Sequence, residues 1–364
     1  MSSDSAPAFL ADVVAAVRLL QSGELVAFPT ETVYGLGADA ADPVAVARIF
    51  AAKGRPAEHP LIVHLPDAAY LEQWAREVPP SAHRLAQAFW PGPLTLILAR
   101  APAVPDAVTG GQDTVGLRVP AHPLSLALLR AFARAGGGRG GLCGIAAPSA
   151  NRFGRISPTH AAHVREELGD AVALVLDGGP CEIGIESTIL DLSRRDAPPR
   201  LLRPGHITPE RIGEVLGVLP ELPESLRETG VPRVSGSLDG HYAPRTAMRL
   251  VTPDDLIRAA EEALAQGKRY GLLLREAKTP PSAHSLRRLP NVPAAFARLL
   301  YAALRELDHA GNDIILVETV PASPDWSAIA NRLRRAAGGS GIRYQVSGIR
   351  NQGKSAAALP PCRS

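Results

Sequence analysis

The chain of 364 residues has little cysteine and few aromatic side chains. Its three cysteines, Cys143, Cys181 and Cys362, are far apart, and no two of them form a C-x-x-C pair. An odd number of scattered cysteines argues against a disulfide framework and against a cysteine zinc site. With aromatic residues at 4%, the chain also has little material for a surface that stacks on nucleic-acid bases. These shortages favour a reducing compartment and a chemistry that does not depend on cysteine.

Long apolar runs and an excess of charge are missing as well. No window approaches the roughly 18 uninterrupted apolar residues of a membrane span. Asp4 and Asp12 lie inside the stretch where a signal peptide would begin. The formal net charge of +3, from 39 basic and 36 acidic residues, is too small to indicate a nucleic-acid coat by itself. We therefore expect a cytoplasmic protein that does not cross a membrane.

The length and the 46% of hydrophobic residues suit two domains, each with its own core. In residues 1–217, short apolar strands and helices intermix without a strict βαβ rhythm, which predicts a mixed sheet. Residues 218–246 are rich in proline and glycine and are predicted to form a linker. Strands and helices alternate regularly in residues 247–339, which predicts a small α/β domain. Residues 340–364 are predicted to be a polar tail.

The first segment that bears on chemistry is PTETVYGLG, residues 29–37, directly after an apolar strand. Small hydroxyl residues and two glycines at a strand end make a loop where a ligand can approach the backbone. The segment is equally compatible with a plain glycine-rich turn, and it lacks the G-x-x-x-x-G-K-[ST] pattern of a Walker A loop. His64, in the later apolar strand LIVHL, stands where a core histidine is more common than a catalytic one.

Two segments carry cations at unusual positions. Lys53 and Arg55 flank a glycine between a helix and a strand, which suits an anion such as a triphosphate. Alternatively, Lys53 complements the negative end of its helix dipole, which leaves Arg55 unexplained. Arg118 stands in the otherwise apolar strand TVGLRV, where a guanidinium is costly unless it is paired or faces a cleft. A structural partner such as Asp113 or Asp177 is the alternative to a ligand.

Polar residues gather in three further segments. Ser149, Asn151 and Ser157 precede a helix start, a place suited to phosphate, although Ser157 also fits a simple N-cap. ESTILDL carries Ser187, and LRPGHIT carries Arg203 before a Pro-Gly turn. Together the segments offer cations and hydroxyls without a nucleophile–base pair or a metal-ligand cluster. Such a site acts by positioning and charge neutralisation, as expected for attack on phosphorus.

Seven segments occur in a fixed order: PTETVYGLG, KGRPxxxPLIVHL, FWPGPLTLIL, GLRVP, PSANxxGxxSPT, STILDL and LRPG. In this order they resemble the YrdC-like threonylcarbamoyl-AMP synthases. The second domain, with HYAP at residues 241–244, resembles the two-domain branch of that family. The resemblance covers roughly residues 10–338.

The resemblance implies an α/β fold, with a YrdC-like mixed twisted sheet, helices and a deep basic cavity, followed by a smaller Rossmann-like α/β C-terminal domain. It implies a nucleotidyltransferase that makes threonylcarbamoyl-AMP and pyrophosphate from L-threonine, bicarbonate and ATP. Mg²⁺ would enter with ATP and be held mainly by the phosphates. A tRNA threonylcarbamoyl transferase would take the product, so this chain would serve tRNA indirectly.

Carried over residue by residue, the resemblance assigns three sets of site residues. The catalytic residues are Lys53 and Arg55. The L-threonine-binding residues are Thr32, His64, Arg118, Ala147 and Ser187. The ATP-binding residues are Arg55, His59, Thr114, Ser149, Asn151, Ser157, Arg203 and Tyr242. No residue is assigned to a metal, and residues 235–244 of the linker are expected to fold over the cavity as a lid.

The chain departs from the family pattern in places. His59 stands where asparagine is usual, GGGRGGLCG reads as an insertion, and SLDGHYAP lacks the basic stretch that commonly precedes HYAP. Two other functions remain as alternatives: a carbamoyl-adenylate-forming enzyme and a non-enzymatic RNA-binding module. The first is accompanied in its family by an acylphosphatase module and Cys-rich zinc motifs, which this sequence lacks. Weak net charge and scarce aromatics count against the second.

Overall fold

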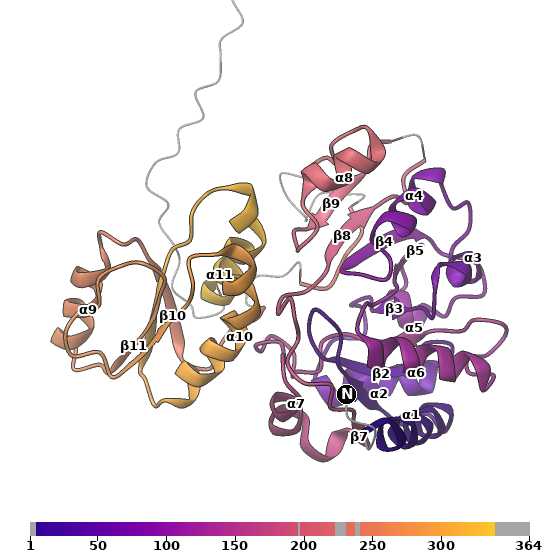
Figure 1. Cartoon of the computed structure of the whole chain (residues 1–364), viewed down its shortest axis with the longest axis horizontal. Coiled ribbons are helices and arrows are strands. Elements are labelled where there is room, and N and C mark those ends of the chain that lie inside the picture. The colour runs from indigo at the N-terminus through magenta and orange to yellow at the C-terminus, as the bar shows by residue number, and fades with distance from the viewer. Residues whose placement is uncertain (1–4, 196, 223–230, 237–240, 339–364) are drawn as a thin grey trace, which may run out of the picture.

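The computed structural model describes most of the chain, namely residues 5–195, 197–222, 231–236 and 241–338. The predicted polar tail, including Cys362, lies outside these residues. Two α/β domains of unequal size lie side by side along the long axis of the molecule (Figure 1). Within the described ranges, no helix combines the length and the hydropathy that a membrane crossing needs.

The larger domain is built on a mixed sheet. Its strands are β1 (Val26–Phe28), β2 (Gly35–Asp39), β3 (Ile62–His64), β4 (Leu94–Ala99), β5 (Thr114–Arg118), β6 (Ile145–Ala146), β7 (Leu174–Val175), β8 (Thr188–Asp191) and β9 (Arg200–Arg203). Among the described residues their order is β7-β1-β2-β6-β3-β5-β4-β8-β9. β1 pairs with β7, β3 with β5 and β4 with β8 in parallel, and the other neighbours are antiparallel. The mixed sheet predicted from the irregular rhythm is confirmed.

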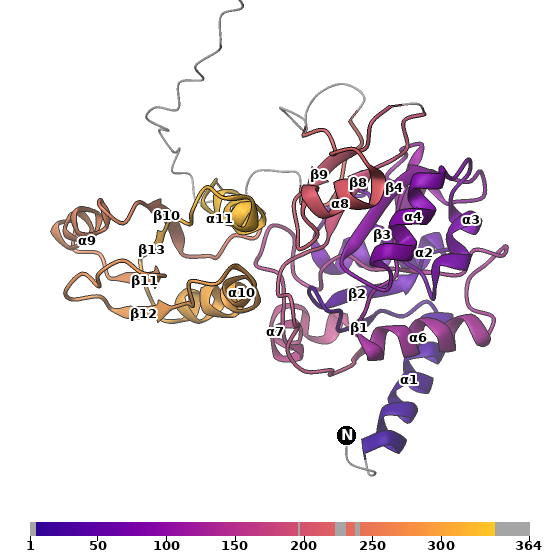
Figure 2. The ribbon, with the colours of Figure 1, turned by 45° about the horizontal axis from the view of Figure 1, so that its top comes forward.

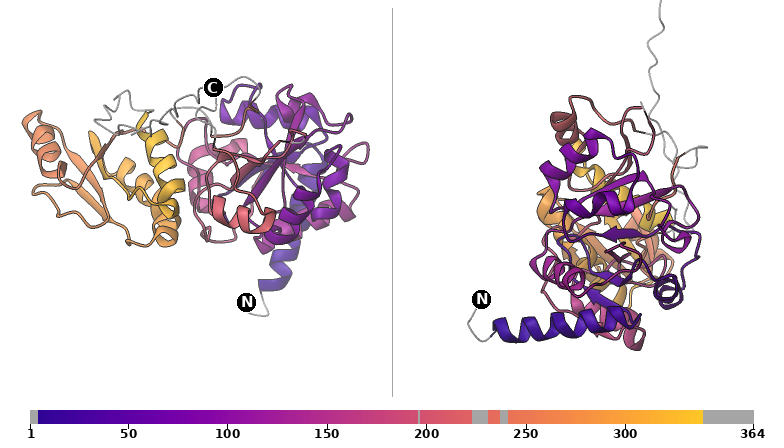
Figure 3. Two further views of the ribbon diagram at one scale, coloured as in Figure 1. Left: turned by 90° about the horizontal axis from the view of Figure 1, so that it is seen from above. Right: turned by 90° about the vertical axis from the view of Figure 1, so that its right-hand side faces the viewer.

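Helices cover both faces of this sheet. They are α1 (Ser5–Gln21), α2 (Pro43–Lys53), η1 (Ala68–Tyr70), α3 (Leu71–Trp74), α4 (Pro80–Phe89), α5 (Asp106–Thr109), α6 (Pro123–Arg134), α7 (Ala161–Leu168), η2 (Gly169–Ala171) and α8 (Pro209–Leu216). α1 and α6 pack together against β1 through Leu20, Leu128 and Phe132. The first half of α1 projects beyond the domain (Figure 3), and Leu10 there is 61% exposed.

Helix α2 shows how local sequence positions the basic residues. Asp42 caps its N-terminus by accepting a backbone N–H of the first turn at 2.9 Å, and Pro43 suits that turn because it lacks a donor. The helix ends at Gly54, which adopts a left-handed φ of 61°. Lys53 and Arg55 therefore stand on either side of the sharp turn that leads toward β3.

The core of the larger domain fixes the strand ends that carry polar residues. Phe28, Leu36, Val63 and Leu117 of the central strands are fully buried. Gly37 is required between two of these strands because a Cβ there would lie 2.7 Å from the Phe28 ring. Close packing of this kind makes the sheet a rigid platform for the site.

The smaller domain has a parallel sheet. Its strands are β10 (Ala247–Val251), β11 (Tyr270–Leu274), β12 (Ser285–Arg288) and β13 (Ile314–Glu318), in the order β10-β13-β11-β12 among the described residues. Its helices are α9 (Leu256–Ala265), α10 (Pro293–His309), η3 (Pro324–Trp326) and α11 (Ser327–Gly338). α10 and α11 lie between this sheet and the larger domain, and α9 lies on the far side (Figure 2). The parallel sheet agrees with the predicted alternation of strands and helices.

A carboxylate closes one end of the smaller sheet. After the adjacent strands β11 and β13, the chain continues in opposite directions along the sheet. The connection after β11 leads to β12 at one edge, and the connection after β13 leads to α11, which packs on β10 at the other edge. Such a switch point is where open parallel sheets bind ligands. Glu318 ends β13 and accepts the backbone N–H groups of Arg275, Glu276 and Ala277 at 2.6–3.0 Å. The chain's own carboxylate thus occupies the place of an anionic ligand.

The two domains meet through buried ion pairs. Arg332 of α11 pairs with Glu186 at 2.7 Å, and Arg305 of α10 pairs with Glu167 at 3.0 Å. The backbones also approach closely, because a Cβ on Gly184 would lie 2.5 Å from a Cα of α10. Residues before and after the linker therefore share one interface.

Candidate active site

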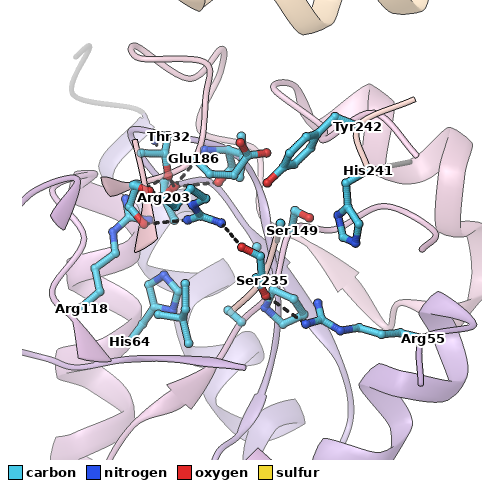
Figure 4. Close-up of a pocket in the computed structure, with 18 residues that line it drawn as sticks. Thr32, Arg55, His64, Arg118, Ser149, Glu186, Arg203, Ser235, His241 and Tyr242 are labelled. Carbon is cyan, nitrogen blue, oxygen red and sulfur yellow. Dashed lines mark hydrogen bonds between the residues drawn. The ribbon is translucent and has the colours of Figure 1, made fainter. Parts of the chain in front are cut away.

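A cavity opens at the ends of the strands of the larger sheet, beside the smaller domain (Figure 4). Its walls come from the β1–β2 loop, β3, β5, the segment after β6, the start of β8, the end of β9 and the linker. The lining residues are Thr30, Thr32, Val33, Gly35, Arg55, Ile62, His64, Arg118, Ala147, Pro148, Ser149, Glu186, Ser187, Arg203, Ser235, Gly236, His241 and Tyr242. The lining carries three guanidinium groups and one carboxylate, so it is basic, as the resemblance implied.

Arg118 ends β5 at one wall of the cavity, 4% exposed. Its Nη2 donates to the carboxylate of Glu31 at 2.6 Å and to Thr32 Oγ1 at 2.9 Å, and its Nε donates to the Gly92 carbonyl at 3.3 Å. The ion-pair partner is thus Glu31, rather than the Asp113 or Asp177 considered from the sequence. A guanidinium has five N–H donors. Among the described residues, nothing accepts a hydrogen bond from the two donors on Nη1, so they are available to a ligand.

His64 lies beside Arg118 at the paired end of β3. It is 3% exposed, and the Phe28 ring meets it edge-on with 6.0 Å between ring centroids. Burial, reinforced by the charge of Arg118, lowers the pKa of His64 to about 3. The imidazole is therefore neutral at physiological pH, and it cannot add a second positive charge next to Arg118.

Arg203, at the end of β9, connects Ser187 to the linker. Its Nε donates to the Ser187 carbonyl at 3.0 Å and its Nη2 donates to Ser187 Oγ at 3.1 Å. Its Nη1 donates to the Ser235 carbonyl at 2.9 Å. Burial lowers the pKa of Arg203, but from a starting value so high that the group stays cationic at neutral pH.

Arg55 reaches the same linker residue from the turn after α2. Its Nη2 donates to the Pro60 carbonyl and to Ser235 Oγ, both at 3.0 Å. Its buried Nε finds no hydrogen-bond partner within the described part of the chain. Burial lowers the pKa of Arg55 to about 10, so the side chain remains charged and has donors to offer an anion.

Lys53 has a different environment from Arg55. Its Nζ donates to the carbonyls of Ser149 and Asn151, and it is not among the lining residues of the cavity. Burial and the neighbouring charge of Arg55 lower the pKa of Lys53 well below its usual value. In this structure Lys53 holds the turn that carries Ser149, so a direct contact of Lys53 with phosphate stays a prediction.

The structure brings most of the predicted site residues into one cavity. These are Thr32, Arg55, His64, Arg118, Ala147, Ser149, Ser187, Arg203 and Tyr242. Four other predicted ATP-binding residues lie elsewhere. The His59 ring packs edge-on against Phe153 with 5.4 Å between centroids, and Thr114 lines a separate hollow. The Asn151 side chain donates to two nearby carbonyls, and Ser157 donates to Glu186 at 2.6 Å.

Described residues of the linker line the cavity. Ser235, Gly236, His241 and Tyr242 line it, and the intervening residues 237–240 lie outside the described part of the chain. Gly236 and Tyr242 lie in close contact, since a Cβ added to Gly236 would be only 2.0 Å from the Tyr242 hydroxyl. The expectation that this segment covers the cavity agrees with these contacts, whereas its response to ligands stays a prediction.

Three lining or supporting residues escaped the sequence reasoning. Glu31 neutralises Arg118, Ser235 binds Arg55 and Arg203, and Glu186 supplies the one carboxylate of the lining described here. Glu31 had a signal, since a buried arginine needs a carboxylate and PTET offers one at a strand end. Ser235 lies in the segment 235–244 that was expected to cover the cavity, but its bonds to two arginines were not predicted. Glu186 had no signal, because its partners are distant in the sequence.

Comparisons with known proteins agree over both domains. The family described as "Telomere recombination" matches residues 18–205, and the family described as "Threonylcarbamoyl-AMP synthase, C-terminal domain" matches residues 207–338. A curated protein of Pyrococcus abyssi (strain GE5 / Orsay) named "Threonylcarbamoyl-AMP synthase" is 42% identical over 330 residues, covering 89% of this chain and 93% of that protein.

Two further relatives extend the agreement. A protein of the same name from Bacillus subtilis (strain 168) is 42% identical over 345 residues, covering 91% of this chain and 94% of that protein. A solved structure described as "Crystal structure of P. abyssi Sua5 complexed with L-threonine" is 40% identical and superimposes with a TM-score of 0.80. It covers 90% of this chain and 94% of that one, so the fold is shared across both sheets.

Proposed function

This chain belongs to the threonylcarbamoyl-AMP synthase family, in its two-domain form, and we propose that it joins L-threonine, bicarbonate and ATP into threonylcarbamoyl-AMP with release of pyrophosphate. It is accordingly an enzyme of the nucleotidyltransferase kind. The observation that carries the proposal is that three guanidinium groups line a single cavity, where Arg118 is bonded to Thr32 and both Arg55 and Arg203 are bonded to Ser235. One cavity thus offers separate cationic positions for an amino-acid carboxylate and for a polyphosphate.

The threonine position lies at Arg118. The free Nη1 N–H groups can donate to a carboxylate, Thr32 and Ser187 offer hydroxyls, and the small Ala147 leaves room for a side chain. Glu31 keeps Arg118 in place while balancing part of its charge. The neutral His64 beside it can take part in a hydrogen bond without competing for the carboxylate as a cation.

The ATP position lies at Arg55 and Arg203. Both guanidinium groups are buried, and both bind Ser235, a neutral residue that triphosphate oxygens can replace as hydrogen-bond acceptors. Ser149 adds a hydroxyl on the turn that Lys53 supports. This arrangement suits neutralisation of the charge that develops as pyrophosphate leaves.

The reaction requires two bond-forming steps. The threonine amine adds to carbon dioxide released from bicarbonate and gives a carbamate. A carbamate oxygen then attacks the α-phosphorus of ATP, and the bond to pyrophosphate breaks. No described side chain has to act as a nucleophile, so the enzyme contributes by holding the carbamate and the triphosphate in line and by excluding water.

The donor set around the cavity does not form a metal cage. The described residues contain no group of three or more His, Cys, Asp and Glu side chains that could hold an ion. The carboxylate of Glu186 already accepts hydrogen bonds from Ser157, Tyr301 and Arg332. We therefore propose that Mg²⁺ arrives with ATP and is held mainly by phosphate oxygens and water.

The product is a reactive mixed anhydride and needs a consumer. We propose that a tRNA threonylcarbamoyl transferase takes it, so that tRNA is served indirectly. The weak net charge of the chain, +3, gives no reason to assign tRNA binding to this protein itself.

The test is a reconstitution with the purified chain. With L-threonine, bicarbonate and ATP, we expect pyrophosphate and threonylcarbamoyl-AMP, identified by mass spectrometry, and neither product when any one substrate is left out. The Arg55→Ala variant is the matched control for contaminating ATPase. Product formation from carbamoyl phosphate in place of threonine and bicarbonate would instead identify a carbamoyl-adenylate-forming enzyme.

A further inference from the structure

Glu186 lines the cavity of the larger domain, but most of its hydrogen-bond donors belong to the smaller domain. Glu186 stands directly before β8, is 6% exposed, and accepts hydrogen bonds from three side chains. Ser157 of the larger domain donates at 2.6 Å. The other two donors belong to the smaller domain: the Tyr301 hydroxyl at 3.0 Å and Arg332 Nε at 2.7 Å.

Arg332 contacts several walls of the cavity from behind. Its side chain is fully buried. Besides the carboxylate of Glu186, it donates to the Glu186 carbonyl at 3.2 Å and to the Pro204 carbonyl at 2.8 Å. Its guanidinium lies 5.5 Å from the centre of the Tyr242 ring. One arginine of the last described helix thus joins the start of β8, the end of β9 and the linker.

Tyr301 makes the second connection. Its hydroxyl is bonded to Glu186, and its ring stacks on Tyr242 with 6.0 Å between centroids. Neither Tyr301 nor Arg332 is a lining residue of the cavity. Both therefore affect the cavity through Glu186 and Tyr242, which do line it.

The charge of Glu186 makes these contacts matter for an anionic ligand. Burial by itself would raise the pKa of Glu186, but the charges of Arg332 and Arg203 outweigh burial and lower it, so the group is a carboxylate. An uncompensated carboxylate in a desolvated cavity repels polyphosphate and attracts the nearest cation. That cation is Arg203, which is otherwise bonded to Ser187 and Ser235.

We infer that the smaller domain is part of the active site, because Arg332 and Tyr301 neutralise and hold Glu186 and so keep Arg203 and Tyr242 free to receive ATP. This inference rests on the proposed function, since it takes ATP as the ligand of the cavity. Arg332 and Tyr301 are positioning residues that do not touch the substrate.

The test is Arg332→Met, which keeps the length of the side chain and removes its charge. We expect a rise of about tenfold or more in the KM for ATP, a change worth about 1.4 kcal/mol. The KM for threonine should change much less. The double variant Glu186→Gln/Arg332→Met removes both charges and should return the KM for ATP to within a few-fold of the wild type.

Arg305→Met is the matched control. Arg305 is equally buried in the same interface and pairs with Glu167, but neither residue lines the cavity. It should lower the unfolding temperature without changing the KM for ATP. Parallel losses in Arg332→Met and Arg305→Met, or no recovery in the double variant, would overturn the inference.

Two further measurements keep the test decisive. Should Arg332→Met fail to fold, Tyr301→Phe removes one hydroxyl and should weaken ATP binding several-fold, and an unchanged affinity would overturn the inference. Calorimetric titration of ATP into the wild type and the variants does not depend on turnover. A chain that bound ATP but made no threonylcarbamoyl-AMP would refute the proposed function while the effect of Arg332→Met on ATP affinity still judged this inference.

Discussion

Arg118 at the end of β5 and Glu318 at the end of β13 occupy comparable positions, since each is the last residue of a strand with a parallel neighbour. Glu318 is enclosed, because three backbone N–H groups after β11 donate to its carboxylate. Arg118 is bound by Glu31 and Thr32 but still faces a cavity. The carboxylate that ends β13 is hydrogen-bonded within the chain, whereas the guanidinium that ends β5 still has N–H donors for a ligand.

The difference separates a strand end that stabilises its own domain from a strand end that faces a ligand cavity. In the smaller domain, a fully bonded carboxylate fills the switch point and fastens the loop after β11 to β13. In the larger domain, Arg55 and Arg203 are held by neutral oxygens, which compensate burial without cancelling the positive charge. A cavity that must receive anions needs cations that are held in this way.

The largest expected effect concerns Arg118. We expect Arg118→Ala to weaken L-threonine binding on the order of a hundredfold, because removing one member of a buried ion pair costs roughly 3–5 kcal/mol. ATP binding should change much less, and calorimetry with each ligand measures both. Arg275→Ala, at the satisfied strand end, is the matched control and should leave both affinities unchanged. Equal losses for both ligands would contradict the assignment of Arg118.

The next effect separates Arg55 from Lys53. Arg55→Ala should lower kcat on the order of a hundredfold while the unfolding temperature stays near that of the wild type. Lys53→Ala should lower both kcat and the unfolding temperature, because its Nζ is bonded to two carbonyls of the turn that carries Ser149. Pyrophosphate release and scanning calorimetry measure the two quantities. If Lys53→Ala kept normal activity, the support that Lys53 gives to the Ser149 turn would not matter for catalysis.

A substitution at Glu318 should convert the satisfied strand end into an open one. Glu318→Ala leaves buried backbone N–H groups unpaired, so we expect the free energy of unfolding to fall by about 1–3 kcal/mol. Inorganic phosphate should then raise the unfolding temperature of the variant more than that of the wild type, because the vacated N–H groups bind an anion. The kinetic constants should not change. Equal stabilisation of both proteins by phosphate would count against the comparison.

The effect that is smallest near neutral pH is a dependence of stability on pH at His64. Its folded pKa of about 3 lies below the ordinary value of 6.5, so between these values the unfolded chain binds a proton that the folded chain does not. The contribution of His64 to stability is complete above about pH 6.5, and as the pH is lowered it is lost by up to about 1.4 kcal/mol per pH unit. Urea unfolding at several pH values should show a shallower acid loss in His64→Gln. Equal slopes would mean that His64 does not titrate in this range.

The local sequence pattern was enough to predict the features that depend on residues close together in the sequence. The arrangement of apolar strands and helices predicted the mixed sheet and the small α/β domain. The resemblance carried by the ordered motifs assigned nine residues that do line the cavity. Arg118 was identified by the cost of a guanidinium in an apolar strand. Its ion-pair partner was not, because Glu31 is 87 residues away and the sheet order decides which loops meet.

Tertiary contacts decided the rest. Lys53 and Arg55 look equivalent in the sequence, but the left-handed turn at Gly54 directs one to loop carbonyls and the other to the cavity. Arg332 belongs to the run NRLRRAA, where arginine at helical spacing normally indicates a solvated face. Its burial follows from the packing of α11 on the larger domain, which no local pattern encodes.

The position of Arg332 late in the chain has a consequence for synthesis. Glu186 and Arg332 are 146 residues apart, so at about 5–20 residues per second the ribosome needs about 7 to 30 s to make the second after the first. Throughout that interval the larger sheet can fold, but the carboxylate of Glu186 lacks its ion pair with Arg332. On the inference drawn above, a chain interrupted before α11 carries the sequence motifs of the larger domain without the side chain that holds Glu186 in place.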